Sequence, residues 1–363
     1  MIRSRILVLA ATLVVVQVSS AAIAADILGA PAPTKLAAVK LPEAREWVLS
    51  GDGVPVGVAV RTPKGMTLSL IDGREQLFDT FGTPYIAERA GSFVVFSPLP
   101  GEVATDWALE FYAANGKQES RNETLHGHSR LAVAANGATV AVAGELKLAA
   151  DKPASSAPRP GLVIYDAKGH EVARRLLDAG ALVNAVAVDT EGNTVVIAYE
   201  APARKAEPRW HIEVVGRNAE VRAHIPLTEA VQGLRLADDG RVLLVLVPGG
   251  VRVFAADGKR MVDLVRLPVG HYIAGPGRIH WRAGQLLAVT EQPVPTRKGS
   301  NTWYLASADP GAKEFRILAK GAVVKSRGSP AFSMAPELGA KEWPVLVVPE
   351  HIIKINPPPR SKS

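Results

Sequence analysis

Cysteine is absent from the 363-residue sequence, and aromatic residues make up only 6% of it. Without thiols the chain cannot form disulfides, use a thiol nucleophile, bind zinc through cysteine or attach haem covalently. Its stability must therefore come from a large buried core, which a chain of this length can form.

The sequence also lacks the common catalytic and cofactor motifs. It contains no Walker loop, no Rossmann glycine fingerprint, no EF-hand loop and no nucleophile-elbow serine motif. The 42 basic and 35 acidic side chains form no block of one sign. Because nucleic-acid binding needs a concentrated basic face, we predict no nucleic-acid partner.

Residues 1–24 have the pattern of a secretory signal peptide. Arg3 and Arg5 precede an apolar stretch, residues 6–18, and small residues follow up to Ala24. The apolar stretch is shorter than the roughly 20 residues of a membrane-spanning helix, and an uncleaved anchor is the alternative. We therefore predict a periplasmic or secreted protein with no membrane span after cleavage, which lowers the net charge from +7 to +5.

The rest of the sequence repeats a unit in which a tight turn separates two apolar runs. These turns fall at glycines spaced 38 to 55 residues apart, namely Gly53, Gly91, Gly137, Gly192, Gly240, Gly284 and Gly339. A second turn follows in most units, at residues 72–73, 115–116, 168–169, 217–218, 257–258 and 310–311. A period of roughly 40 to 50 residues is typical of propellers, and Asn-Gly and Asp-Gly turns join antiparallel strands. Each unit is therefore predicted to be a four-stranded blade.

Some strands, such as residues 242–247, are apolar at every position, so both faces of the sheet must be covered. Blades packed around an axis meet this requirement, so we predict an all-β propeller of about seven four-stranded blades, with six as the alternative. The last unit lacks a fourth strand, which residues 35–41 could supply, so the ring is predicted to close by pairing the termini. The predicted organisation is a signal peptide at 1–24, an N-terminal segment with the candidate closing strand at 25–40, the propeller at 41–357 and a basic tail at 358–363.

Two dipeptides, Gly127-His128 and Gly270-His271, fall where WD repeats carry Gly-His, and Tyr165-Asp166 ends a strand where they carry Trp-Asp. In architecture, the mature chain therefore resembles the WD-repeat and quinoprotein-like β-propellers. The resemblance implies a propeller that binds partners, with no particular reaction. Pyrroloquinoline-quinone dehydrogenases of this architecture typically carry a Trp-ending repeat signature and often adjacent cysteines, which this sequence lacks.

The connections between predicted second and third strands are long, and they share the face opposite the short turns. They span residues 144–160, 200–209 and 291–301, and loops on a rigid scaffold commonly carry recognition. Their excess of basic over acidic residues indicates an anionic partner, and the alternative is that they are ordinary solvated loops. The candidate binding residues in them are Lys147, Lys152, Arg159, Arg204, Lys205, Arg209, Arg297 and Lys298.

Three tryptophans, Trp107, Trp210 and Trp303, stand just before predicted third strands. A residue type that recurs at one repeat position more often packs between blades than binds a ligand. Their place near the long loops keeps ligand binding as the alternative interpretation.

Three histidines are candidate metal ligands. His126 and His128 lie two residues apart, on one side of an extended strand, and His271 has an equivalent place in another unit. The alternative is that His128 and His271 hold turns by hydrogen bonds. Calcium in the central channel would instead need oxygen ligands. The candidates by position, which are also common turn residues, are Asn184, Asp189 and Asp238.

Together these patterns predict a binding or assembly module that contacts another envelope or secreted protein, or an anionic ligand, through its long-loop face. No cofactor is expected. The alternative is a metal-dependent, lactonase-like hydrolase or lyase that uses calcium or a transition metal in the central channel. The lining of the channel distinguishes the two, because converging carboxylate, amide or imidazole groups would indicate the enzyme.

Overall fold

The protein is described by a computed structural model in which nearly all regular structure is β-strand. No helix in the described part of the chain is long and apolar enough to cross a membrane. One short 3-10 helix, η1 (Pro276–Arg278), accompanies the strands. The described residues are 34–35, 46–50, 55–62, 65–70, 75–78, 83–87, 92–98, 106–147, 158–202, 208–237, 240–282, 284–309, 311–325, 331–333, 345–348 and 351–354.

The described strands group into seven four-stranded antiparallel blades. The first blade consists of β2 (Glu46–Ser50), β3 (Pro55–Thr62), β4 (Gly65–Leu70) and β5 (Glu75–Phe78). The second consists of β6 (Thr83–Ile86), β7 (Phe93–Pro98), β8 (Asp106–Tyr112) and β9 (Gln118–Val133). The third shares β9 and adds β10 (Val140–Leu146), β11 (Arg159–Tyr165) and β12 (Glu171–Leu176). The next two consist of β13 (Leu182–Val188), β14 (Thr194–Glu200), β15 (Trp210–Gly216) and β16 (Val221–Leu227), then β17 (Gly233–Ala237), β18 (Val242–Val247), β19 (Gly250–Ala255) and β20 (Arg260–Arg266). The last two consist of β21 (Ile279–Arg282), β22 (Gln285–Pro293), β23 (Ser300–Ala308) and β24 (Arg316–Lys325), then β25 (Ala331–Ser333), β26 (Val345–Val348), β27 (His351–Lys354) and β1 (Thr34–Lys35).

The first three blades are hydrogen-bonded into one continuous sheet. Strand β9 serves two blades, because its first half pairs with β8 and its second half pairs with β10. Strands β2 and β6 pair in parallel where Leu49 lies opposite Tyr85. The strand order inside each blade is nevertheless the sequential one that the two turns per unit predict.

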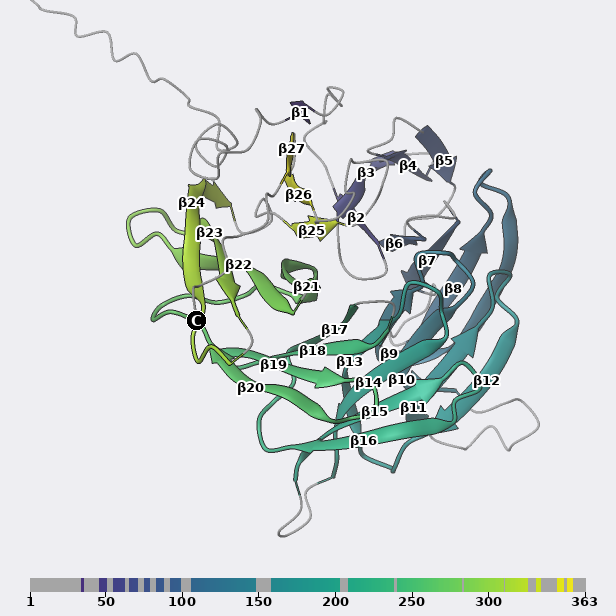
Figure 1. The fold of residues 1–363 in the computed structure, drawn as a ribbon. Coiled ribbons are helices and arrows are strands. Elements are labelled where there is room, and N and C mark those ends of the chain that lie inside the picture. The colour runs from purple at the N-terminus through teal and green to yellow at the C-terminus, as the bar shows by residue number, and fades with distance from the viewer. Residues whose placement is uncertain are drawn as a thin grey trace, which may run out of the picture.

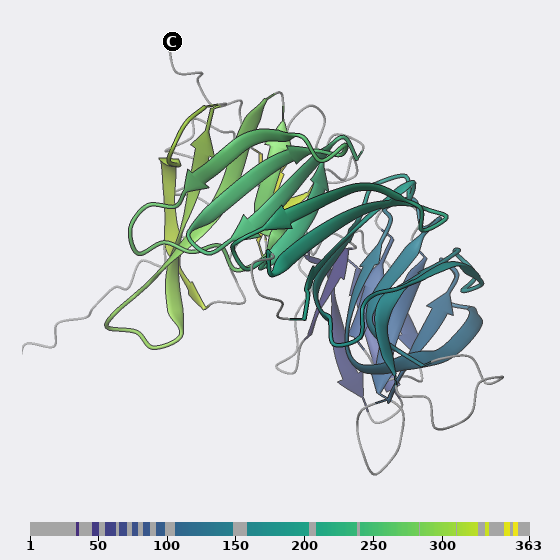
Figure 2. The same ribbon diagram turned by 90° about the horizontal axis from the view of Figure 1, so that it is seen from below.

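The blades are arranged as a propeller. The first strand of each blade contacts the first strand of the next, along the series β2, β6, β9, β13, β17, β21 and β25. Figure 1 shows these strands nearest the centre, with β5, β12, β16, β20 and β24 at the periphery. Figure 2 shows successive sheets lying next to one another. The all-β propeller of about seven blades is therefore confirmed.

The seventh blade combines the two ends of the described chain. Thr34 pairs with Ile352 and Lys35 pairs with His351, which places β1 next to β27 as a fourth strand. This pairing is consistent with a ring that closes through its termini. Residues 36–41 of the predicted closing segment, the predicted signal peptide and the tail at 358–363 lie outside the described residues.

The core lies between neighbouring blades as well as within them. Every residue of β18 is buried, as its uninterrupted apolar sequence predicts. One core cluster joins Val214 of the fourth blade to Leu243 and Val245 of the fifth. Each blade therefore needs its neighbours to cover its apolar faces.

The short turns share one face of the propeller, and the glycines predicted to form the first turn fall between the first and second strands. The described ones have the positive φ that glycine tolerates best, namely Gly137, Gly192, Gly240 and Gly284.

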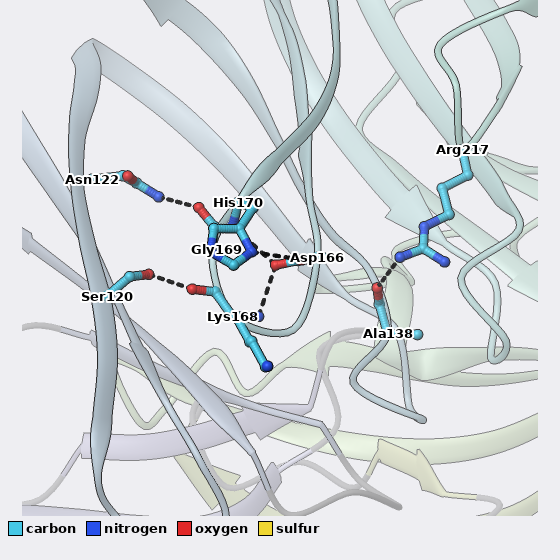
Figure 3. A network of polar contacts seen from close by, with 8 residues as sticks. All are labelled: Ser120, Asn122, Ala138, Asp166, Lys168, Gly169, His170 and Arg217. Atoms are coloured by element: carbon cyan, nitrogen blue, oxygen red, sulfur yellow. Dashed lines mark hydrogen bonds and ion pairs between the residues drawn. The ribbon is translucent and has the colours of Figure 1, made fainter.

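Hydrogen bonds join this turn face from blade to blade (Figure 3). Asn122, on β9, donates to the carbonyl oxygen of Gly169 in the next blade at 2.7 Å, and Arg217 donates to the carbonyl oxygen of Ala138 at 3.0 Å. The turn face is therefore used to hold neighbouring blades together.

The contact between Gly321 and Trp303 gives a test of the core. A Cβ atom at Gly321 would overlap the fully buried indole of Trp303. We expect Gly321→Ala to lower the free energy of unfolding by about 1–3 kcal/mol, as overpacked cores do. Denaturant unfolding measures this. Gly275→Ala is the control, because nothing lies within 4 Å of its added Cβ atom, and equal stability losses in the two variants would contradict the packing described here.

Candidate functional site

The basic residues predicted on the long loops are mostly tied to nearby groups where the structure describes them. The ammonium of Lys147 lies 2.6 Å from the carboxylate of Asp106, and Arg209 forms an ion pair with Glu200. Arg159 donates to a backbone carbonyl oxygen at 3.0 Å. Such exposed or half-exposed pairs contribute little binding capacity, because their charges are already compensated.

The remaining predicted bases divide into two groups. Arg297 and Lys298 are exposed at the tip of the connection between β22 and β23. Lys152, Arg204 and Lys205 lie outside the described residues. The predicted basic surface on the long loops therefore stays a prediction.

The three tryptophans lie within third strands, not before them. Trp303 is fully buried in β23, and Trp107 in β8 stacks on Phe96 with ring centroids 4.5 Å apart. Trp210 is the first residue of β15 and packs against the core cluster of its blade. All three positions favour packing over ligand binding.

The structure does not bring the predicted metal ligands together among the described residues. The side chains of His126 and His128 lie outside the description, and two whole blades separate their strand from the blade of His271. His271 bonds through Nδ1 to the Thr290 hydroxyl at 2.9 Å, and burial lowers its pKa, so it remains neutral at physiological pH. No group of three or more His, Cys, Asp or Glu able to hold a metal occurs in the described part of the chain.

The candidate calcium ligands in the inner strands serve local structure where they are described. The Asp189 carboxylate accepts hydrogen bonds from the backbone N–H groups of Asn193 at 2.7 Å and Thr194 at 3.1 Å, which is turn chemistry. Asp238 lies outside the described residues, and Asn184 lines the cavity described next.

A cavity of 230 Å³ lies along the first strands, where the propeller axis runs. It is lined by parts of β6, β9, β13 and β17 and by Pro276 of η1. The polar lining residues are Tyr85, Arg130, Asn184, Gln232 and Arg235. None of the described lining residues is acidic, and two of them, Arg130 and Arg235, are cationic.

Both arginines of this cavity are positioned by backbone carbonyl groups. Arg130 donates from Nε to the carbonyl oxygen of Asn184 at 3.0 Å. The buried Arg235 donates to the carbonyl oxygen of Ile279 at 2.7 Å and also reaches that of Gly277 at 3.3 Å. With two cations and no acidic side chain among the described lining residues, the cavity favours an anionic occupant.

Asn184 and Tyr85, also in the cavity wall, add neutral hydrogen-bond donors to the two arginines. The buried Nδ2 atom of Asn184 has no hydrogen-bond partner among the described residues, so it is a donor without an acceptor. Burial raises the pKa of Tyr85, and the positive charge of Arg130 opposes that shift. The cavity therefore offers a hydroxyl, an amide and two cations to one acceptor group.

The sequence does contain a pattern that indicates this cavity, although all the basic residues predicted to bind a ligand lie in the long loops. Arg235 stands in Leu234-Arg235-Leu236, within a first strand that is otherwise apolar or small, and Arg130 directly precedes an apolar run at residues 131–133. A charged residue in a strand that faces the axis points to a functional or structural role of that charge.

A second polar cluster fixes the loop before η1. The buried carboxylate of Glu291 accepts hydrogen bonds from Tyr272 at 2.9 Å and Asn301 at 2.7 Å, and it lies 3.4 Å from Arg278. Burial and the hydrogen bond to Glu291 raise the pKa of Tyr272 to about 12. The hydroxyl therefore stays protonated and keeps donating at physiological pH.

Comparison with known proteins gives no family. No family model matches the chain, and no curated protein matches it. Among solved structures, a eukaryotic initiation factor aligns at 11% identity with a TM-score of 0.45, over 77% of this chain and 64% of its own. The Dos1 propeller aligns at 10% identity with a TM-score of 0.46, over 82% of this chain and 75% of its own. The propeller architecture rests on the strand topology described above, and these two similarities add nothing about function.

The Glu291 cluster predicts a large effect of one substitution. We expect Glu291→Ala to lower the free energy of unfolding by about 3 kcal/mol, because it leaves Arg278 and the Tyr272 hydroxyl without their buried partner. Thermal and denaturant unfolding check this against the exposed control Glu314→Ala. A loss below 1 kcal/mol would show that the cluster does not hold this loop.

Proposed function

We propose that the chain is an extracytoplasmic binding or assembly module that holds an anionic group in its central cavity, with the long-loop face as the contact surface. The anionic group belongs to a small ligand or to another envelope or secreted protein. The observation that carries the proposal is the wall of the cavity, where the Arg130 guanidinium and the unpaired Nδ2 of Asn184 are donors and none of the described lining residues is acidic.

The energetics of the cavity support an anionic occupant. A buried donor without an acceptor costs about 1–3 kcal/mol, so an anion that accepts from Asn184 Nδ2 would remove an existing penalty. The volume of 230 Å³ suits a single carboxylate-bearing group better than an extended ligand. Charge-assisted hydrogen bonds from guanidinium groups are stronger than neutral ones, which favours a carboxylate or phosphate.

The distribution of structural contacts supports the long-loop face as the contact surface. Hydrogen bonds between blades occupy the turn face, as those of Asn122 and Arg217 do. The exposed bases Arg297 and Lys298 lie on the other face and have the charge sign that an anionic partner requires. The metal-dependent hydrolase has less support, because the described cavity wall combines the amides of Asn184 and Gln232 with two guanidinium groups and no described carboxylate, and cations repel a metal ion.

The anion-binding proposal is tested with glutarate and with a glutamate-rich peptide as probes. We expect Arg130→Gln and Asn184→Leu each to weaken binding about tenfold in calorimetry, because each removes one donor from the cavity wall. Added salt should weaken binding by the wild-type protein as well. The control is Arg222→Gln, which removes a positive charge from the exposed surface of β16. Unchanged affinities in both cavity variants, or no binding of either probe, would contradict the proposal.

Export is the second part of the proposal, and the sequence of residues 1–24 supports it. We expect the protein isolated from its producing cell to begin at Ala25. Intact-mass spectrometry of the periplasmic and culture-medium fractions measures this. A full-length mass in the cytoplasmic fraction would contradict export.

A further inference from the structure

A second cleft, of 350 Å³, lies between the third and fourth blades, away from the central cavity. Arg175 at the end of β12 forms one side of it, and β14, β15 and β16 form the other. Ala201 and Pro202 line it where β14 passes into the long connection at residues 201–209. Its volume falls within the range of about 300–1,000 Å³ that is usual for small-molecule sites.

Three rings cross the floor of this cleft in a row. Tyr199 on β14 lies opposite His211 on β15, and His224 on β16 continues the row. The ring centroids of Tyr199 and His211 are 5.5 Å apart, and those of His211 and His224 are 4.9 Å apart with planes within 8° of parallel. Tyr199 and His211 are direct cross-strand neighbours, and His224 is the diagonal neighbour of His211, next to Pro226, which lies opposite it.

Two of the charged groups beside the rings, Arg175 and Glu213, form an ion pair. Arg175 forms two hydrogen bonds with the Glu213 carboxylate, at 2.6 and 2.9 Å, and Tyr199 donates to the same carboxylate at 3.1 Å. Burial and the Glu213 charge raise the pKa of Tyr199 well above its ordinary value, so the phenol remains neutral. Asp178 adds a second carboxylate to the lining, so an anion in the cleft would meet two acidic groups and is disfavoured.

The two histidines give the cleft a group that can either donate or accept. Nδ1 of His211 lies 2.9 Å from Nε2 of His224, and in the neutral pair one nitrogen donates and the other accepts. When Nε2 of the exposed His224 donates in this hydrogen bond, its Nδ1 is an acceptor, and when Nε2 accepts, its Nδ1 carries the proton and donates. His224 can therefore match either a donor or an acceptor on a ligand.

We infer that this cleft is a binding site for a neutral saccharide, separate from the anion site of the proposed function. A sugar ring has C–H faces that pack on aromatic rings, and its hydroxyl groups each donate and accept hydrogen bonds. The ring row matches the C–H faces, and His224, which can donate or accept, matches the hydroxyl groups. The Arg175–Glu213 pair and Asp178 leave no excess positive charge for an anionic sugar. Leu177 and Pro202 add apolar wall for the same sugar ring.

The test uses the full mature protein on a printed glycan array, followed by calorimetry with the neutral glycan that gives the strongest signal. We expect a neutral glycan to bind, and its affinity to fall at least tenfold in His224→Ala and in Tyr199→Ala. Tyr199→Phe keeps the ring and should retain most of the affinity, which separates stacking from misfolding. The control is Lys320→Ala on the exposed edge of the sixth blade, which should bind like the wild type.

Three results would overturn the inference. They are an array without any bound glycan, binding of charged glycans alone, and binding that survives both His224→Ala and Tyr199→Ala. Melting temperatures of all variants show whether a loss of binding reflects the cleft or the fold, and His224→Ala decides if Tyr199→Ala does not fold. The anion probes test Arg130 and Asn184, whereas the glycans test residues of the separate cleft. A negative result at one site therefore does not affect the interpretation of the other.

Discussion

The packing of apolar strands between neighbouring blades is the constraint on which the rest of the structure depends. Strand β18 is buried along its whole length, and Leu243 within it contacts a cluster that continues into the preceding blade. No cysteine is available to fix the blades to one another covalently. Each blade therefore gains its stability from the apolar surface that its neighbours cover, and a blade without a neighbour would expose that surface to water.

Because of this packing constraint, the face that carries the short turns differs in role from the opposite face. Strands that must pack side by side are joined most compactly by tight turns, and on the turn face hydrogen bonds such as that of Asn122 hold successive blades in register. Packing between blades constrains the side chains of the opposite face and the axis less, so charged side chains are tolerated there. Arg235 lies near the axis, where two backbone carbonyl groups accept hydrogen bonds from its guanidinium. A scaffold built for packing thus leaves a cavity near its axis that is lined by two arginines.

The fold was largely predictable, whereas the sites were not. Gly137 and Gly192 mark turns because glycine tolerates a positive φ. The number of blades can therefore be predicted from the spacing of such glycines, without knowledge of any long-range contact. Lys147 and Arg209 looked like binding residues because the sequence does not show that Asp106 and Glu200 neutralise them. Trp303 was correctly favoured as a packing residue, since recurrence at one repeat position already implies burial in the same environment.

The sequence by itself determined the period, the strand order within each blade, the positions of the tight turns and the absence of thiol chemistry. These properties follow from local backbone preferences and from side-chain polarity along a single strand. Only the tertiary structure decided that Arg130 and Arg235 line the same cavity, and that Tyr199, His211 and His224 form one row. Those arrangements depend on the register between strands and on the packing of different blades, which no local pattern records.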